Sequence, residues 1–360
     1  MDVGSVVPSS VKPGPVKPGP VDVISAGIVI ADCVACPVRR LPLPGQLALV
    51  DEISLFVGGS AANTAVALAR LGLRAAVVGR VGADGFGDFL LGSLGAAGCD
   101  TRFLHRGVAP TSATLVNVDA SGERSFLHAM GANAVLSASD LPLELLAREG
   151  ARALHVAGYY VLPGLEPGLP DLLDRASRLG LLTSLDNVWN PSGDRSSSGD
   201  TDHSGNWERI HACLPLSDLF CPSLHEARQI TRREQPADVV DALLGLGVRR
   251  MVALKMGEHG ALIGTPDGAR LHLRGLSVPV IDGTGAGDAF IGGVLAGLLA
   301  GETPEGAGRL GNAAGALCVG AMGAAAGLRD LDTTRALAAT VQVEHWNAER
   351  PPFPDSRGAP

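Results

Sequence analysis

The sequence predicts an α/β fold in which a mostly parallel sheet is flanked by helices on both faces, with a small antiparallel sheet beside it. Three observations lead to this prediction. Short apolar runs rich in β-branched residues alternate with longer helix-like stretches along most of the 360 residues. This spacing of strand, helix and strand implies right-handed crossovers between parallel strands. Two segments, residues 30–57 and 111–129, break the alternation.

The alternation continues over most of the chain, and each run is bounded by glycine or polar residues. In chain order the runs are DVISAGIVIAD (22–32), SAANTAVALARLG (60–72), RAAVVGRVG (74–82), GFGDFLLGSLGAAG (85–98), RALHVAGYY (152–160), DLLDRASRLG (171–180), LLTSLD (181–186), SDLFCPS (217–223), DVVDALLGLG (238–247), MVALKMG (251–257) and the apolar helix after Asp288. The segment 111–129 instead alternates apolar and polar residues around Ala120, Ser121 and Gly122, as a hairpin with one exposed face does. With residues 30–57 it is expected to form the small sheet, which would serve as a lid.

The two ends of the chain differ in composition from its body. Residues 11–20 read VKPGP twice, and such prolines favour extended conformations without a packed core. We therefore expect a disordered arm over 1–20, one globular domain over 21–346 and a second tail over 347–360. The polar stretch 192–205 is expected to be a surface excursion.

Charge and hydropathy limit the possible partners. The formal net charge is −8, and no run of Lys or Arg reaches the density of a nucleic-acid or anionic-membrane binder. The amino-terminal residues contain no apolar signal segment. The uncharged stretch 313–328 is shorter than the roughly 18 residues that a bilayer requires. The expectation is a cytoplasmic protein that binds neither nucleic acid nor membrane.

The six cysteines are scattered, which predicts reduced thiols rather than a disulfide framework. Cys33 and Cys36 form one CxxC, but no second pair and no histidines at ligand spacing accompany them. Ordinary packing is the expected role of these thiols, and zinc is not expected.

The stretch IDGTGAGDAF at residues 281–290 suggests two familiar motifs and fits neither. A dinucleotide fingerprint would have glycine where Asp288 stands, and it would lie early in the chain. A phosphate-binding P-loop would have lysine after its last glycine. The glycines still expose backbone N–H groups at a helix start, which favours a bound anion. Asp288 could then be a base for an acceptor hydroxyl or only a helix cap, and the spacing alone leaves both open.

Two long motifs together resemble the ribokinase-like, PfkB-type carbohydrate kinases. They are DGTGAGDAF (282–290), and GGSAANTAVALARLG (58–72) followed by GRVGADGFG (79–87). The resemblance covers about residues 21–340. It implies that Asp288 is the catalytic base, and that Gly285, Ala286 and Gly287 form the anion hole.

The same resemblance implies the substrate site. Asp32 matches a strand-end carboxylate that binds sugar hydroxyls, and Gly59 and Asn63 match positions that contact the sugar. A solvated Asp32 and a capping Asn63 remain the alternatives.

Magnesium and a monovalent cation are implied in the same way. Glu226 matches the glutamate that organises Mg²⁺ through water. Ser223, however, stands where the family has asparagine. The alternative for Glu226 is an ordinary exposed helix residue. Asp282 matches a residue that supports K⁺ in some members, with Gly283 replacing the usual threonine, so K⁺ is optional.

ATP is the implied phosphoryl donor. Gly257 and Gly260 match the glycine turn beside its phosphates, and Asn312 matches a contact near the adenine. Lys255 either touches a phosphate or is solvated.

These assignments predict ATP-dependent phosphorylation of a hydroxymethyl group. Ser60 stands where several relatives carry lysine, which favours a small, unphosphorylated sugar. A nucleoside kinase is the enzymatic alternative, with Tyr159 and Tyr160 as candidate pocket residues, although only 4% of residues are aromatic. A catalytically silent sugar or nucleotide sensor is the other alternative. Because lids in this family often pair between subunits, a homodimer is favoured.

Overall fold

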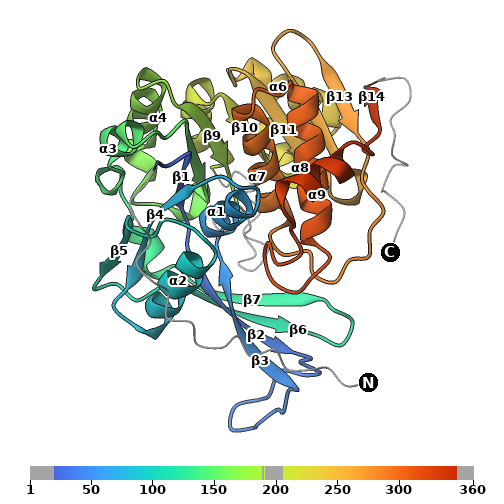
Figure 1. Cartoon of the computed structure of the whole chain (residues 1–360). Helices are drawn as coiled ribbons and strands as arrows, with labels where there is room; N and C mark the ends of the chain where they lie inside the picture. Colours follow the sequence, from blue (N-terminus) through green and yellow to red (C-terminus); the bar gives the residue numbers. More distant parts are fainter. Residues whose placement is uncertain (1–19, 189, 191–205, 347–360) are drawn as a thin grey trace.

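The computed structural model describes residues 20–188, 190 and 206–346. The predicted arm before Val21 (apart from Pro20), the excursion at 192–205 and the tail at 347–360 lie outside these residues. The described part forms a large sheet with helices on both faces and a small sheet below it (Figure 1). This confirms the predicted fold class.

The large sheet is parallel over most of its width. Its strand order is β14-β13-β12-β11-β10-β9-β8-β1-β4-β5, and every neighbouring pair from β11 to β5 is parallel. The pairs from β11 to β14 are antiparallel. The strands are β1 (Val23–Gly27), β4 (Ala75–Gly82), β5 (Leu104–Gly107), β8 (Ala153–Ala157), β9 (Leu182–Asp186), β10 (Leu219–Phe220), β11 (Met251–Lys255), β12 (Ala261–Gly264), β13 (Arg270–Leu273) and β14 (Val343–His345).

The helices cover the two faces because successive strand residues point to opposite sides. On β1, Ile24 belongs to a core cluster that includes buried residues of α3, α4, α5 and α6, whereas Val23 belongs to a cluster that includes buried residues of α1, α2, α7 and α8. On α4 the buried residues recur at the helical spacing of 169, 172, 173 and 176. The helices are α1 (Ser60–Arg70), α2 (Gly85–Ala96), α3 (Leu143–Arg148), α4 (Leu169–Arg178), α5 (Leu224–Thr231), α6 (Pro236–Gly245), α7 (Ala286–Leu299), α8 (Pro304–Cys318) and α9 (Leu331–Ala338).

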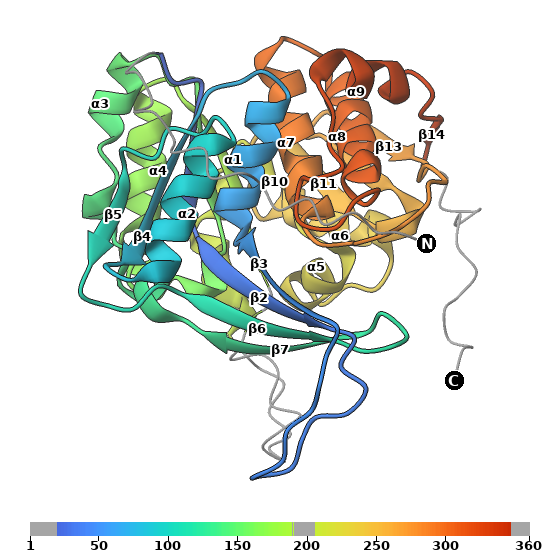
Figure 2. The ribbon, with the colours of Figure 1, turned by 60° about the horizontal axis from the view of Figure 1, so that its bottom comes forward.

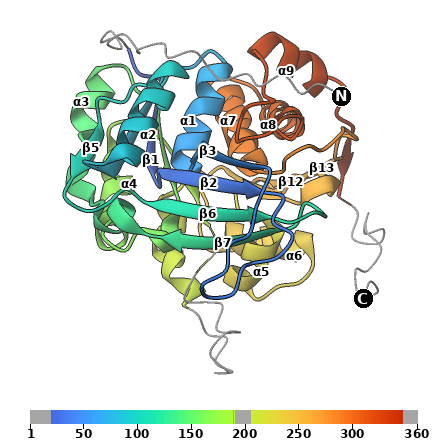
Figure 3. The same ribbon diagram turned by 90° about the horizontal axis from the view of Figure 1, so that it is seen from below.

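The small sheet consists of β3 (Glu52–Gly58), β2 (Ile30–Cys36), β6 (Ala113–Val118) and β7 (Arg124–Ala129), in that order. Figures 2 and 3 show it lying across the α/β body. The pairs β2–β3 and β6–β7 are antiparallel, as predicted, but β2 and β6 pair in parallel because they join two separate hairpins. The chain leaves the large sheet after Gly27, so β2 follows β1 almost directly and carries its residues beneath the carboxyl edge of the large sheet.

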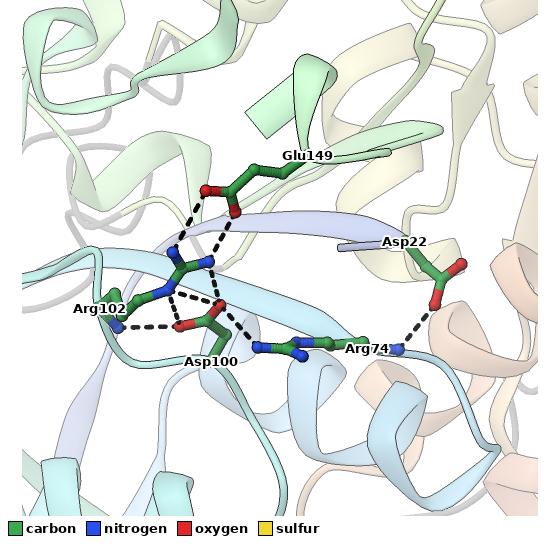
Figure 4. A network of polar contacts seen from close by, with 5 residues as sticks. All are labelled: Asp22, Arg74, Asp100, Arg102 and Glu149. Atoms are coloured by element: carbon green, nitrogen blue, oxygen red, sulfur yellow. Dashed lines mark hydrogen bonds and ion pairs between the residues drawn. The ribbon is translucent and has the colours of Figure 1, made fainter. Parts of the chain in front are cut away.

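At the amino ends of the strands, a buried ion-pair network joins neighbouring segments (Figure 4). Asp100, whose side chain is 0% exposed, accepts hydrogen bonds from Arg102 and Arg74. Arg102 also pairs with Glu149, and the backbone N–H of Arg74 donates to Asp22. The network therefore fixes the starts of β1, β4 and β5, at the edge of the sheet opposite the site described below.

The cysteines behave as predicted in the described residues, where all six are free thiols. Cys33 and Cys36 lie three residues apart on β2, so their side chains point to opposite faces. None of the described helices is long and apolar enough to cross a bilayer.

Candidate active site

The carboxyl ends of the parallel strands bring two predicted residues, Glu226 and Lys255, together with Asp186, which was not predicted. Asp186 ends β9, Glu226 follows β10 and Lys255 ends β11. In an open α/β sheet this edge is where ligands bind, because the loops beyond the strands are free to vary. The first turn of α7, which contains Asp288, lies against the same edge, since Lys255 Nζ would be 3.4 Å from a Cβ placed at Gly287.

Asp288 does not cap its helix. The N-cap of α7 is Gly285, whose φ of 75° is a left-handed conformation that suits glycine. The carboxylate of Asp288 instead accepts a hydrogen bond from Asn63 Nδ2, over 2.8 Å. Residues 285–287 thus form the start of the helix, and the carboxylate of the next residue is held from the side by α1.

The pKa of Asp288 is displaced toward neutrality. The pKa is raised to about 6, mainly by burial and further by the charge of Glu226, and the opposing effects of the Asn63 hydrogen bond and the charge of Lys255 are smaller. A carboxylate with a pKa near 6 is still ionised at pH 7 and is a stronger base than an exposed aspartate. Its environment therefore suits proton transfer.

Asn63 lies in α1 and does not cap that helix, because the N-cap is Gly59 and no side chain caps it. Helices α1 and α7 approach closely: a Cβ at Gly292 would lie 2.9 Å from Ala67 Cβ. This packing brings Asn63 to Asp288. The predicted contact between Asn63 and a sugar stays a prediction, whereas its contact with Asp288 was missed.

Asp32 is half-buried on β2, and its carboxylate lies against the backbone of Gly58. A Cβ at Gly58 would be 2.0 Å from Asp32 Oδ2, so only glycine leaves room for this side chain. Burial is the main cause that raises the pKa of Asp32 to about 6, because it outweighs the lowering effects of the Thr114 hydrogen bond and the Arg124 charge. Asp32 is therefore only partly exposed to solvent, and its predicted contact with sugar hydroxyls stays a prediction. Gly58 was missed, although it is the first glycine of the GGSAAN motif.

Gly59, the predicted substrate contact, is required by the backbone. Its φ is 89°, and a Cβ there would lie 2.4 Å from the carbonyl oxygen of Ile28. The turn before α1 therefore depends on Gly59, and its contact with a sugar is not tested by this geometry.

Glu226 and Ser223 form a capping box at the start of α5. Ser223 Oγ accepts from the Glu226 N–H over 3.3 Å, and Glu226 Oε2 accepts from the Ser223 N–H over 3.0 Å. The spacing S-x-x-E could have predicted it. Glu226 is half-buried rather than a plain exposed helix residue.

Lys255 is not solvated. Its Nζ lies 3.1 Å from Asp186 Oδ1, and the two side chains are 16% and 3% exposed. Burial by itself would lower the pKa of Lys255, but the carboxylates of Asp186 and Glu226 raise it above its usual value. A charged ammonium group therefore lies beside Gly287, one of the predicted anion-hole residues.

A groove of about 690 Å³ extends from this ammonium group. It is lined by the predicted nucleotide residues Lys255, Gly257, Gly260 and Asn312, together with Gly287. Gly260 has a φ of 87°, and a Cβ there would lie 2.0 Å from Leu273 O. Asn312 Nδ2 donates to Arg274 O over 2.7 Å, so its amide nitrogen supports the groove wall.

Asp282, the predicted support for K⁺, forms an ion pair with a side chain of this protein, Arg124. Its side chain is 4% exposed and pairs with Arg124 of β7. Asp282 also accepts from the N–H groups of Thr284 and Gly323, over 2.8 and 2.9 Å. No sequence signal identified Arg124, because its partner lies 158 residues away.

Tyr159 and Tyr160 do not line the site. They are 2% and 5% exposed and belong to the core, where Tyr160 donates its hydroxyl hydrogen to Trp207 O over 2.6 Å. Phe56 and Phe126 line the cleft between the small sheet and the Asp282 loop instead.

Comparison with known proteins gives consistent matches. The model of the pfkB family carbohydrate kinases matches residues 21–331. The 2-dehydro-3-deoxygluconokinase of Bacillus subtilis is 31% identical over 297 residues, which are 79% of this chain and 87% of that protein. The structure of Arabidopsis thaliana ribokinase with ribose and ATP has a TM-score of 0.74 at 24% identity, covering 89% of this chain and 99% of that one. A fructokinase double mutant from Vibrio cholerae, in a form with fructose, ADP and potassium, has a TM-score of 0.71 at 25% identity, covering 89% and 99%.

Proposed function

The chain belongs to the pfkB family of carbohydrate kinases and is a phosphotransferase, and from this premise we propose that it transfers the γ-phosphoryl group of ATP to a hydroxymethyl group of a small, unphosphorylated sugar. One observation carries the proposal. The Asp288 carboxylate, with a pKa of about 6, lies one residue beyond three backbone amides at the start of α7.

The chemistry follows from this arrangement. Asp288 takes the proton of the acceptor hydroxyl, and Asn63 holds the carboxylate in place. The N–H groups of residues 285–287 stabilise charge on the phosphoryl group as it moves. Because the transition state of phosphoryl transfer is loose, positioning and electrostatics supply most of the acceleration. The silent-sensor alternative has no use for this base.

The groove that begins at Lys255 is the proposed ATP site. The ammonium group beside Gly287 suits the terminal phosphates, and Gly257 and Gly260 let the backbone approach the nucleotide. Asn312 lies farther along the groove, where we place the adenine. The ribokinase and fructokinase structures hold ATP and ADP, which supports a nucleotide as the phosphoryl donor.

Magnesium fits the site together with the nucleotide. Among the described residues, no group of three His, Cys, Asp or Glu side chains could hold a metal ion alone. Mg²⁺ is usually bound through substrate phosphates, its own waters and one or two carboxylates. Glu226, oriented by Ser223, and Asp186 are the carboxylates that would hold its waters. When bound, the ion neutralises phosphate charge.

The substrate site is proposed around Asp32, Gly59 and Asn63, under the small sheet, which acts as a lid. Ser60 Oγ is buried and has no hydrogen-bond partner among the described residues, so a sugar hydroxyl can satisfy it. The cation that lines this cleft, Arg124, already pairs with Asp282. Both observations favour a neutral sugar over a sugar phosphate.

A panel of acceptors with ATP and Mg²⁺ tests this proposal. It contains aldoses, ketoses, sugar acids, sugar phosphates and nucleosides, and ADP release is measured for each. We expect turnover with an unphosphorylated sugar. Turnover with nucleosides alone would replace this proposal with the second candidate, a nucleoside kinase, which Phe56 and Phe126 favour because aromatic rings in the cleft can stack on a base.

We also infer a homodimer formed through the small sheet. Several large apolar side chains beside that sheet are exposed, and they gather in one stretch of the chain. They are Leu41, Leu43, Leu47, Leu49 and Ile53. Exposed apolar patches of this kind mark interaction surfaces. Light scattering should give twice the chain mass for the wild type. For the double variant Leu47→Asp and Leu49→Asp it should give the mass of one chain.

A further inference from the structure

Arg124 connects the small sheet to the loop that precedes the anion hole. It is the first residue of β7, and its guanidinium group donates to Thr284 Oγ1 and Asp282 Oδ1. Both acceptors belong to the segment 282–284, directly before Gly285. Arg124, a side chain of the small sheet, therefore holds Asp282 and Thr284, which directly precede the proposed anion-hole amides of residues 285–287.

Asp282 carries this connection into the loop itself. Its Oδ1 accepts from the Thr284 N–H, and its Oδ2 accepts from the Gly323 N–H. The residue after Gly323 lies against the N-cap of α7, since a Cβ at Gly285 would be 2.7 Å from Ala324 Cβ. The carboxylate of Asp282 thus holds both backbone segments beside the proposed anion hole, residues 282–284 and residues 323–324.

The charge of Asp282 needs this partner. Asp282 is 4% exposed, and Arg124 is the cation that the structure pairs with it in the described part of the chain. A buried carboxylate without a counter-charge is strongly destabilised. The side chain of Arg124 is 26% exposed and comes from a separate sheet, so any motion of the small sheet away from the body breaks the pair.

We propose that Arg124 is a positioning residue that completes the anion hole only when the small sheet covers the cleft. It supplies the positive charge at Asp282 that a monovalent cation would otherwise supply, and it lets closure of the lid order the amides of residues 285–287. This rests on the proposed function of Asp288 and its loop. The mechanism also limits transfer of the phosphoryl group to water, because the open state lacks a formed anion hole.

Kinetics of Arg124→Ala test the proposal directly. We expect kcat to fall by about 10- to 100-fold, with a smaller change in the KM for sugar, since a small displacement of catalytic groups has effects of this size. Millimolar guanidinium should restore part of kcat, because it replaces the lost cation. Arg124→Lys, which retains the charge but not the two-point contact, should lie between the two. The matched control is Arg106→Ala on β5, which removes an exposed ion pair with Asp88.

Hydrogen exchange provides a measurement that does not need turnover. In Arg124→Ala, amides of residues 282–288 and of β7 should exchange faster than in the wild type, and guanidinium should slow them again. Thr284→Val, which removes one of the two acceptors of Arg124, should give a smaller increase and keeps the test valid should the alanine variant fail to fold. Unchanged kcat and unchanged exchange in the loop would overturn the proposal. If the wild type phosphorylates no acceptor, the proposed function fails, and the exchange experiment still decides the role of Arg124.

Discussion

Asn63 Nδ2 donates a hydrogen bond to Asp288 Oδ2 over 2.8 Å, although the two residues are 225 positions apart in the chain. The contact joins the first turns of α1 and α7, which pack closely. The proposed base is therefore held by the helix that also begins at the predicted substrate glycine. This relationship makes the pKa of Asp288 dependent on Asn63.

Asn63→Ala should move the pH dependence of the reaction upward. The Asn63 amide lowers the pKa of Asp288, so its removal raises that pKa above about 6. Since the base acts only when deprotonated, the acid limb of kcat/KM should shift to higher pH by about one unit, the size expected for loss of a hydrogen bond to a charged group. The control is Asn117→Ala on β6, and an unshifted limb in Asn63→Ala would contradict the assignment.

Gly58→Ala should weaken sugar binding. The new Cβ would lie 2.0 Å from Asp32 Oδ2, so the carboxylate must move. Loss of its hydrogen bonds to the sugar should reduce kcat/KM for the acceptor by about 10- to 100-fold, while the KM for ATP stays near its wild-type value. Gly92→Ala in α2, where nothing lies within 4 Å of the new Cβ, is the matched control and should leave both constants unchanged.

Lys255 should be protected by nucleotide. It is the only lysine in the described part of the chain, since the other two are Lys12 and Lys17. An amine-reactive reagent, read out by peptide mass spectrometry, should label Lys255 less in the presence of MgATP, with labelling of Lys17 as the internal control. Equal labelling of Lys255 with and without nucleotide would show that ATP does not cover it.

Asp100→Ala should destabilise the protein without a direct effect on the site. The substitution removes the buried carboxylate that Arg74 and Arg102 share, and the expected loss in free energy of unfolding is about 3 kcal/mol. Asp88→Ala removes an exposed pair and should have an effect below about 1 kcal/mol. Urea unfolding at pH 7 measures both, and equal losses would contradict this view of the network.

The same network predicts how the free energy of unfolding depends on pH. Hydrogen bonds and charge from Arg102 and Arg74 outweigh burial, which acts the other way, and hold the pKa of Asp100 below its ordinary value of 3.8. The stabilisation is therefore complete above the unfolded-state pKa and is lost as the pH falls through the lower folded-state pKa. In Asp100→Ala this part of the acid sensitivity should be absent.

Much of the fold was predictable because its signals are local. Alternating runs predicted the parallel strands, and the alternation in 111–129 predicted the hairpin of β6 and β7. The parallel pairing of β2 with β6 was not predictable, since it depends on how two hairpins meet in space. The same limit applies to Tyr159 and Tyr160, which follow β8 toward the active edge but turn into the core.

Most residues of the candidate site were predicted from the sequence, but their hydrogen-bond and ion-pair partners were not. The glycine loop and Asp288 are contiguous, so a motif contains them, and S-x-x-E at 223–226 carried a capping signal that was overlooked. The pairs Asn63–Asp288, Lys255–Asp186 and Arg124–Asp282 join distant segments. Only the packing of helices and sheets determines them.

The most direct test of the account is the turnover of Asp288→Asn beside the matched variant Asp88→Asn, which changes an exposed acid in the first turn of α2. Asparagine preserves shape and hydrogen bonding but cannot accept the proton. We predict that Asp288→Asn binds MgATP and sugar much as the wild type does, with kcat lower by about 1,000-fold or more, and that Asp88→Asn is unaffected. A kcat for Asp288→Asn within about tenfold of the wild type, a loss too small for removal of a general base, would contradict the central claim that this carboxylate activates the acceptor.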